Sequence, residues 1–98
     1  MDQNSIVNDI INYITQTSYT TASDWYVGIA TSPSARLFSD HNVDQGSGHW
    51  IYCQAMSEKV ARAAEQILIR KHPFKGGVGG GLCPTYVYAY RITSFTSE

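Results

Sequence analysis

The sequence predicts a single α+β domain, residues 1–98, in which three helices flank a small, mainly antiparallel, three-stranded sheet. Two observations lead to this fold class. Segments with apolar residues at helical spacing alternate with segments in which apolar residues occur at every second position. No linker or repeat divides the 98 residues, a length typical of one domain, and 43% of them are apolar, as in other globular proteins.

Three segments have the features of helices. Isoleucines at helical spacing predict an N-terminal helix over residues 4–16. A Ser-Pro pair, typical of a helix start, opens a second helix that covers residues 32–40. A serine N-cap opens a third helix over residues 57–71, and a proline shortly afterwards marks its end.

Three segments with alternating side chains are expected to form the sheet, namely residues 24–31, residues 49–55 and the C-terminal strand 85–93. The element order also allows some parallel pairing through crossover connections. The last strand places three tyrosines on one of its faces, Tyr86, Tyr88 and Tyr90.

The charges indicate which partners the chain suits. Residues 1–56 hold five aspartates and one arginine, a net charge of −4, whereas residues 57–98 hold six basic residues and three glutamates, a net charge of +3. The basic half can attract phosphate, but proteins that grip long duplex DNA are usually more basic. The lack of a long apolar run argues against a membrane partner, and the absence of an export signal together with two distant cysteines predicts a cytoplasmic setting.

An ordered set of polar residues lies on these elements. A Tyr26-Val27-Gly28 triplet ends the first strand, Arg36 and His41 follow on the second helix, and Glu65 lies within the third. This set resembles the GIY-YIG endonuclease domain over residues 24–81, from its second strand to its glutamate-bearing helix.

The resemblance implies hydrolysis of a phosphodiester in nucleic acid. In that case Glu65 would hold one Mg²⁺ or Mn²⁺ ion, and Arg36 would contact phosphate oxygens. Tyr26 and His41 would orient or deprotonate the attacking water.

The chain departs from the family pattern in three places. No Gly-Ile-Tyr triplet precedes Tyr26, and no Asn follows the glutamate helix. The third departure is an additional strand at the C-terminus. We therefore expect a permuted arrangement, in which this strand occupies the place of the missing one and brings Tyr88 or Tyr90 to the site.

A glycine-rich loop offers a second candidate for phosphate contact, because bare backbone N–H groups bind anions. With the glycine of the first strand, the candidate ligand-binding residues are Gly28, Lys75, Gly76, Gly77, Gly79 and Gly80. No Gly-Lys-Ser/Thr closes the loop and a strand follows it, so it is not a Walker loop. A flexible connection is the alternative interpretation.

Each site residue also has a purely structural interpretation. Arg36 can pair with Asp40, and Glu65 with Arg62, as exposed pairs one helical turn apart. His41 can be a packed residue at a helix end, and Glu65 lies only at the border of its helix's apolar stripe. The tyrosines of the last strand can pack on a helix or stack on bases. A zinc site is disfavoured because no close Cys or His pair is present.

Three functions follow from these alternatives. The favoured hypothesis is a degenerate nuclease-like protein whose phosphate-directed pocket binds a nucleotide or nucleic acid without cleaving it. The second is an active metal-dependent phosphodiesterase that uses Tyr26, Arg36, His41 and Glu65. The third is a homodimeric interaction module whose aromatic faces, including Trp25 and Trp50, pair with each other.

Overall fold

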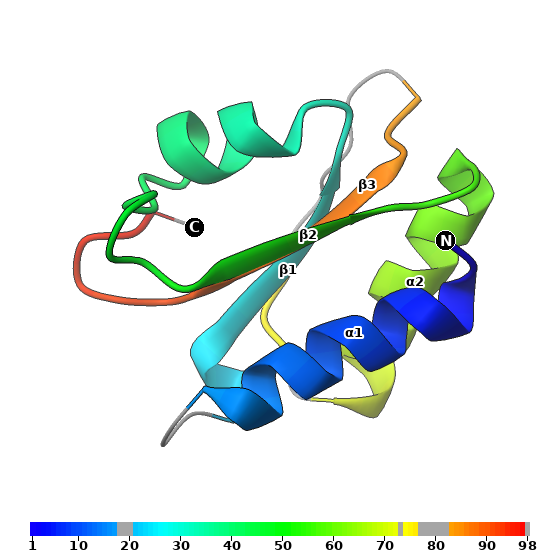
Figure 1. The fold of residues 1–98 in the computed structure, drawn as a ribbon, viewed down its shortest axis with the longest axis horizontal. Helices are drawn as coiled ribbons and strands as arrows, with labels where there is room; N and C mark the ends of the chain where they lie inside the picture. The colour runs from blue at the N-terminus through cyan, green and yellow to red at the C-terminus, as the bar shows by residue number, and fades with distance from the viewer. Residues whose placement is uncertain (18–20, 73, 77–82, 98) are drawn as a thin grey trace.

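The computed structural model describes residues 1–17, 21–72, 74–76 and 83–97, and it confirms an α+β fold with three antiparallel strands. The elements follow the order shown in Figure 1. They are α1 (Gln3–Gln16), η1 (Ala22–Asp24), β1 (Trp25–Ala30), η2 (Ala35–Asp40), β2 (Trp50–Gln54), α2 (Glu58–Lys71) and β3 (Tyr86–Arg91).

The C-terminal strand lies in the middle of the sheet. The strand order is β1-β3-β2, and both neighbours of β3 run antiparallel to it. In this register Tyr90 lies opposite Tyr26, and Tyr88 lies opposite both Gly28 and Tyr52. The strand predicted to replace the missing motif is therefore directly beside β1, so its tyrosines share a sheet face with Tyr26.

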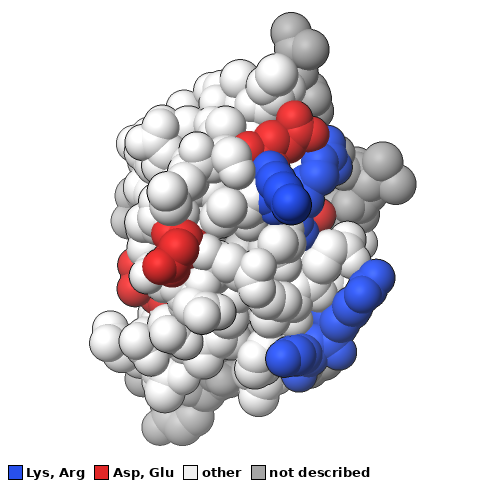
Figure 2. All heavy atoms as spheres, turned by 90° about the vertical axis from the view of Figure 1, so that its right-hand side faces the viewer, with Lys and Arg blue, Asp and Glu red and all other residues white. Residues whose placement is uncertain are grey.

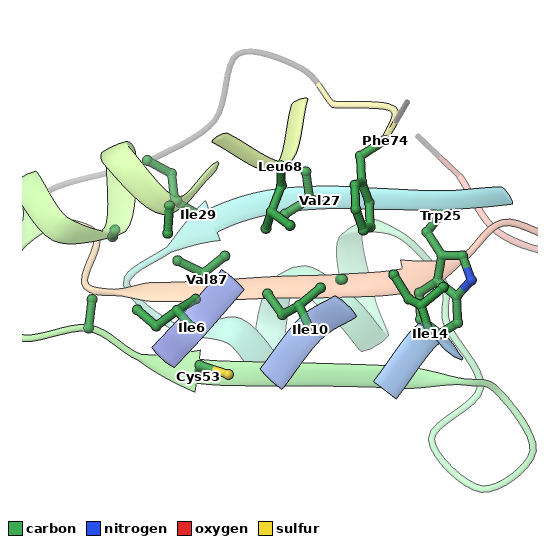
Figure 3. Close-up of a cluster of buried hydrophobic side chains, with 14 residues drawn as sticks. Ile6, Ile10, Ile14, Trp25, Val27, Ile29, Cys53, Leu68, Phe74 and Val87 are labelled. Carbon is green, nitrogen blue, oxygen red and sulfur yellow. The ribbon is translucent and has the colours of Figure 1, made fainter. Parts of the chain in front are cut away.

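One face of the sheet packs against α1 and α2 (Figure 1). We call it the aliphatic face. Figure 3 shows its centre, where isoleucines of α1 and Leu68 of α2 pack against Val27, Ile29 and Val87. Trp25 is fully buried in this core beside Tyr13, so it is not part of an exposed aromatic surface.

The two long helices form where capping and apolar periodicity agree. The Asp2 carboxylate accepts a hydrogen bond of 2.8 Å from the Ser5 backbone N–H at the start of α1. The Ser57 hydroxyl accepts one of 3.2 Å from the Val60 N–H at the start of α2. Among the described residues, no helix is long and apolar enough to cross a membrane.

The opposite face of the sheet, which we call the tyrosine face, is covered by η2 (Figure 1). Tyr26, Tyr88 and Tyr90 are buried on it together with Leu37 and Val43. The outer edge of β1 is partly covered as well, because Val27 N–H donates to the Lys75 carbonyl at 2.8 Å in a parallel bridge.

The helix expected over residues 32–40 contains a π-helix at Ala35–Asp40 rather than ending as an ordinary α-helix. Its defining hydrogen bond runs from His41 N–H to the Arg36 carbonyl, five residues back, at 2.8 Å. Asn42 then adopts a φ of 56°, which an asparagine tolerates better than most residues, and the helix ends. The π-turn changes the direction in which His41 points relative to Arg36.

Candidate functional site

Three of the residues proposed from the sequence, Tyr26, Arg36 and His41, lie around the hydroxyl of Tyr88, whereas Glu65 of α2 acts on it only through its charge. His41 hydrogen-bonds to it, and Arg36, Tyr26 and Glu65 are each close enough to shift its pKa. These side chains come from four elements or their ends, β1, η2, α2 and β3. Arg36 and His41 are five residues apart, and both reach Tyr88 from the π-turn.

His41 occupies the centre of a hydrogen-bond network. Its Nε2 lies 2.8 Å from the Tyr88 hydroxyl, and its Nδ1 lies 2.7 Å from the Ser97 carbonyl. The Tyr90 hydroxyl is 3.1 Å from the same Nδ1 and donates to the Ser97 carbonyl at 3.3 Å. The side chain is buried, as the packing alternative predicted, but its partners are polar groups of other site elements.

Two aromatic rings pack beside this imidazole. The Tyr26 and Tyr90 rings stack with centroids 5.3 Å apart, and both lie within 5 Å of the His41 ring centroid. The three rings thus form one tilted aromatic cluster, which restricts the space in which the imidazole can turn. Tyr26 thus helps to hold His41 as well as facing the site.

Arg36 reaches the site from η2 while keeping contact with its helical neighbour. Its Nε lies 3.3 Å from Asp40 Oδ2, the pair expected from the sequence. That contact lacks hydrogen-bond geometry, so the buried Nε–H has no acceptor. The charge and a side-chain hydrogen bond of Arg36 lower the pKa of Tyr88, which shows that the guanidinium faces this hydroxyl as well.

Tyr88 is protonated at neutral pH. Burial raises the pKa of its hydroxyl to about 12, and the favourable effect of Arg36 does not overcome this desolvation. Tyr26 and Glu65 raise the pKa further because each disfavours a negative charge nearby. The hydroxyl therefore acts through its proton and its hydrogen bonds rather than as a resident phenolate.

Glu65 is buried, with an exposed fraction of only 6%, whereas the sequence suggested a place at the border of its helix's apolar stripe. Its Oε2 has no hydrogen-bond partner. Burial raises the pKa of this carboxyl, and the charge of Arg62 lowers it only in part. A buried carboxylate oxygen without a partner is costly, and a cation would satisfy it.

Gly28 has a packing role that is independent of any ligand. A Cβ at this position would lie 2.5 Å from the Tyr88 hydroxyl and 2.6 Å from the ring carbon that bears it. The Tyr88 ring therefore lies directly on the Gly28 backbone. This contact accounts for glycine at the position, while phosphate binding by its N–H stays a prediction.

The glycine loop is described only at its beginning. Lys75 and Gly76 lie along the outer edge of β1, where a Cβ on Gly76 would meet Ile69 Cδ1 at 2.7 Å. Gly77, Gly79 and Gly80 lie outside the described residues. The prediction that this loop cradles phosphate remains open.

Sequence reasoning missed two features. The segment Thr93–Ser97 reaches back to His41, 56 positions earlier in the chain, and no local pattern indicates such a contact. A surface cavity of about 480 Å³ also opens between this segment and the loop before β2. It is lined by polar and apolar residues, including Asp44, Arg91 and Phe95, and it does not include the residues around Tyr88.

The metal-binding potential of the site rests on one carboxylate. No group of three or more His, Cys, Asp or Glu side chains gathers within the described ranges. Glu65 alone, with its partnerless oxygen, fits the pattern in which Mg²⁺ takes one carboxylate and completes its shell with water and phosphate oxygens. Cys53 and His49 form no such group, and burial raises the pKa of the Cys53 thiol to about 11.

Comparisons with protein-family models, with curated proteins and with solved structures gave no match to this chain. The resemblance to the GIY-YIG domain therefore stays a prediction from the sequence.

Proposed function

We propose that this protein is a metal-dependent phosphodiesterase that acts on nucleic acid. The observation that carries the proposal is the contact of His41 and Arg36 with the Tyr88 hydroxyl, with Tyr26 packed on His41 and the buried Glu65 carboxyl near enough to raise the pKa of Tyr88. The sequence favoured a degenerate site because the Gly-Ile-Tyr motif upstream of Tyr26 and an Asn after the glutamate helix are missing, the net charge is near neutral and a large glycine loop is present. Tyr88, supplied by the central strand, offers the hydroxyl that this argument lacked.

The proton chemistry follows from the network. Tyr88 takes a proton from the attacking water while its own proton passes along the 2.8 Å hydrogen bond to Nε2 of His41. The water oxygen then bonds to phosphorus, the bond from phosphorus to the leaving oxygen breaks, and solvent protonates the leaving oxygen. Because the pKa of Tyr88 is about 12, this transfer must be concerted rather than proceed through a stable phenolate.

Arg36 and Glu65 provide the charges for this reaction. The guanidinium of Arg36, with its unused Nε–H, would bind a non-bridging phosphate oxygen and stabilise the charge that grows there. Glu65 would hold a divalent cation through its partnerless Oε2. A bound cation supplies Lewis acidity at the phosphate.

A row of aromatic side chains favours nucleic acid over a small phosphorylated ligand. Trp50, Tyr52 and Tyr86 lie on the tyrosine face, and Tyr52 is 5.9 Å from each of the other two rings. Tyr52 is 43% exposed and lies directly opposite Tyr88 in the sheet register. Exposed aromatic rings stack on unpaired bases, so a strand held by its phosphate at Arg36 can place a neighbouring base here.

The distribution of charge limits the size of the contact. On the face shown in Figure 2, the basic residues form two separate groups, one of them beside acidic residues, and most of the surface is neutral. A long duplex is held by many phosphate contacts. The surface therefore favours a short or single-stranded target, where stacking contributes more than electrostatic contacts.

The proposal is tested by cleavage of a supercoiled plasmid and of a fluorescently labelled single strand with Mg²⁺ or Mn²⁺. We expect cleavage to fall about a hundredfold or more in Glu65→Gln and in Arg36→Gln. Glu58→Gln and Arg70→Gln are the matched controls, because they neutralise half-buried Glu58 and exposed Arg70 of α2 and should keep full activity. Absence of cleavage by the unaltered protein, or equal loss in the controls, would contradict the proposal.

A second candidate function is phosphate binding without hydrolysis. It is favoured by the complete burial of Tyr88, since water reaches this hydroxyl only if the covering side chains move. Under this alternative, a nucleoside monophosphate raises the melting temperature and Arg36→Gln abolishes the effect, while no substrate is cleaved. The thermal-shift and cleavage assays together separate the two functions.

A further inference from the structure

We infer that the segment Thr93–Ser97 acts as a strap that fixes the tautomer of His41, and thereby sets the direction of proton transfer between His41 and Tyr88. The Ser97 carbonyl and Tyr90 are then positioning groups, which act through His41 and touch no substrate. The catalytic consequence of this inference rests on the proposed function. The tautomer itself does not depend on the proposed function, and it can be observed even if the protein has no cleavage activity.

The tautomer follows from the chemistry of one contact. A carbonyl oxygen has no proton to give, so the 2.7 Å contact between Ser97 O and His41 Nδ1 is a hydrogen bond only when Nδ1 carries the proton. In the neutral imidazole the other nitrogen, Nε2, then has a free lone pair. That lone pair faces the Tyr88 hydroxyl at 2.8 Å, so Tyr88 is the donor of this bond.

Hydrogen bonds connect the strap with His41 and Asn42 at the end of η2. Ser97 N–H donates to the His41 carbonyl at 2.7 Å, so these two residues exchange hydrogen bonds in both directions. The Asn42 amide donates to the Phe95 carbonyl at 2.9 Å. These contacts place the Ser97 carbonyl opposite Nδ1 by a geometry that the main chain largely determines.

Hydrogen bonds within the strap also hold it in a turn. Thr93 N–H donates to the Thr96 hydroxyl at 3.0 Å, and Phe95 N–H donates to the Thr93 hydroxyl at 3.2 Å. Such side-chain contacts to the backbone form a compact turn. The turn redirects the chain after β3, so that Ser97 comes back toward His41.

Tyr90 supports the same arrangement from the sheet. Its hydroxyl donates to the Ser97 carbonyl at 3.3 Å and lies 3.1 Å from Nδ1. The carbonyl oxygen therefore receives two donors, which orient it more strongly than one would. Tyr90 thus has a role distinct from that of Tyr88: it contacts the side of His41 that is fixed, whereas Tyr88 contacts the side that accepts a proton.

The test is the ¹⁵N NMR spectrum of the histidine side chains in the full chain, recorded at a pH where His41 is neutral. His49→Gln and His72→Gln identify the signals of the other two histidines. We expect His41 to show a protonated Nδ1 and an unprotonated Nε2, the opposite of the tautomer that free histidine prefers in water. Deleting residues 96–98 should shift His41 toward the Nε2–H tautomer.

Two further variants separate the carbonyl from other effects of the segment. Ser97→Ala keeps the carbonyl and should keep the tautomer, which makes it the matched control for the deletion. Tyr90→Phe removes one donor to the carbonyl and should produce a partial shift. If the protein cleaves its substrate, the deletion should lower kcat about tenfold or more with little change in KM, while Ser97→Ala does neither.

The outcomes are distinct for the strap and for the proposed function. A neutral His41 with its proton on Nε2, or an unchanged tautomer in a deletion variant whose near-ultraviolet circular dichroism is native, would overturn the inference. If His41 has the expected tautomer but the protein cleaves nothing, the inference about the strap is supported and the proposed phosphodiesterase function is contradicted. If the deletion variant does not fold, the tautomer of the unaltered protein and the shift in Tyr90→Phe still decide the matter.

Discussion

The two faces of the sheet differ in the kind of side chain that they bury. The aliphatic face packs Ile, Val, Leu and Ala side chains against α1 and α2, and the Nε1 of Trp25 is the polar atom there without a partner. The tyrosine face buries His41 and three tyrosines under η2, and it joins them by hydrogen bonds. Both faces are buried, but the second gathers its titratable side chains around one hydrogen-bond network, whereas the first buries the Cys53 thiol among apolar side chains.

This difference shows how a chain of 98 residues combines an apolar core with a buried polar network. Burial of apolar surface on the aliphatic face provides most of the free energy of folding, because that term grows with buried area. The tyrosine face contributes less, since buried polar groups exchange water contacts for protein contacts at a small net gain. Variants of the two faces should therefore affect stability and site chemistry separately.

The largest expected effect on stability comes from Leu68→Ala on the aliphatic face. Leu68 is fully buried in α2, so the variant leaves a cavity and should lower the free energy of unfolding by about 2–5 kcal/mol. Urea denaturation measures this loss. The His41 signals should remain unchanged in the folded variant. Met56→Ala, at a 75% exposed position, is the control and should change the free energy of unfolding by less than about 0.5 kcal/mol.

Gly28→Ala tests the packing of the tyrosine face. The new methyl group would overlap the Tyr88 hydroxyl, and the displaced ring should lower the free energy of unfolding by about 1–3 kcal/mol. Unlike Leu68→Ala, it should also change the ¹⁵N signal of His41 Nε2. Gly46→Ala is the control, because a Cβ there meets its nearest neighbour at an ordinary 3.5 Å. Equal behaviour of the two alanine variants would contradict the described contact.

Glu65→Gln tests the charge buried at the site. Because burial raises the folded-state pKa of this carboxyl, folding favours its protonated form. The free energy of unfolding should therefore fall as pH rises from the ordinary pKa of a glutamate carboxyl, which holds in the unfolded state, through the higher folded-state pKa. Glu65→Gln should lack this decline, whereas Glu58→Gln should retain it. Denaturation curves across this pH interval that coincide for all three proteins would refute the prediction.

The smallest expected effect on stability belongs to Tyr52→Ala, at the exposed border of the tyrosine face. The variant should change the free energy of unfolding by less than about 1 kcal/mol. It should weaken binding of an oligothymidylate about fivefold or more, since one stacked base contributes about 1–3 kcal/mol. Quenching of Trp50 fluorescence reports this binding, and Met56→Ala should bind normally. Unaltered affinity in Tyr52→Ala would exclude a stacking role.

The sequence predicted the fold class and the approximate place of each element because these depend on local periodicity. Isoleucines at helical spacing form α1, and alternating residues form β1 and β3, as expected. The set of candidate site residues came from the resemblance of residues 24–81 to a known domain. The inference that β3 lies beside Tyr26 came from the same resemblance, and the observed strand order agrees with it.

The remaining features depend on contacts that local patterns do not encode. The hydrogen bond of a π-turn spans five residues instead of four, and apolar periodicity does not encode this extra residue, so it could not predict that Arg36 and His41 both reach Tyr88. The burial of Glu65 depends on how α2 lies against the sheet rather than on its position in the helical wheel. The contact between Ser97 and His41 joins residues 56 positions apart. Since the Ser97 group involved is a backbone carbonyl, which every residue type has, the identity of residue 97 could not indicate the contact.

The π-turn of η2 also affects how such a site can be found in other chains. Residues four apart in an α-helix lie about 40° apart around its axis, on nearly the same side. The hydrogen bond from His41 to Arg36 gives residues five apart a comparable relation. An Arg and a His separated by four intervening residues in this chain thus correspond to a pair separated by three in a regular helix. A sequence pattern with one fixed Arg–His spacing would find either the chains with a regular helix or the chains with a π-turn, and it would overlook the others.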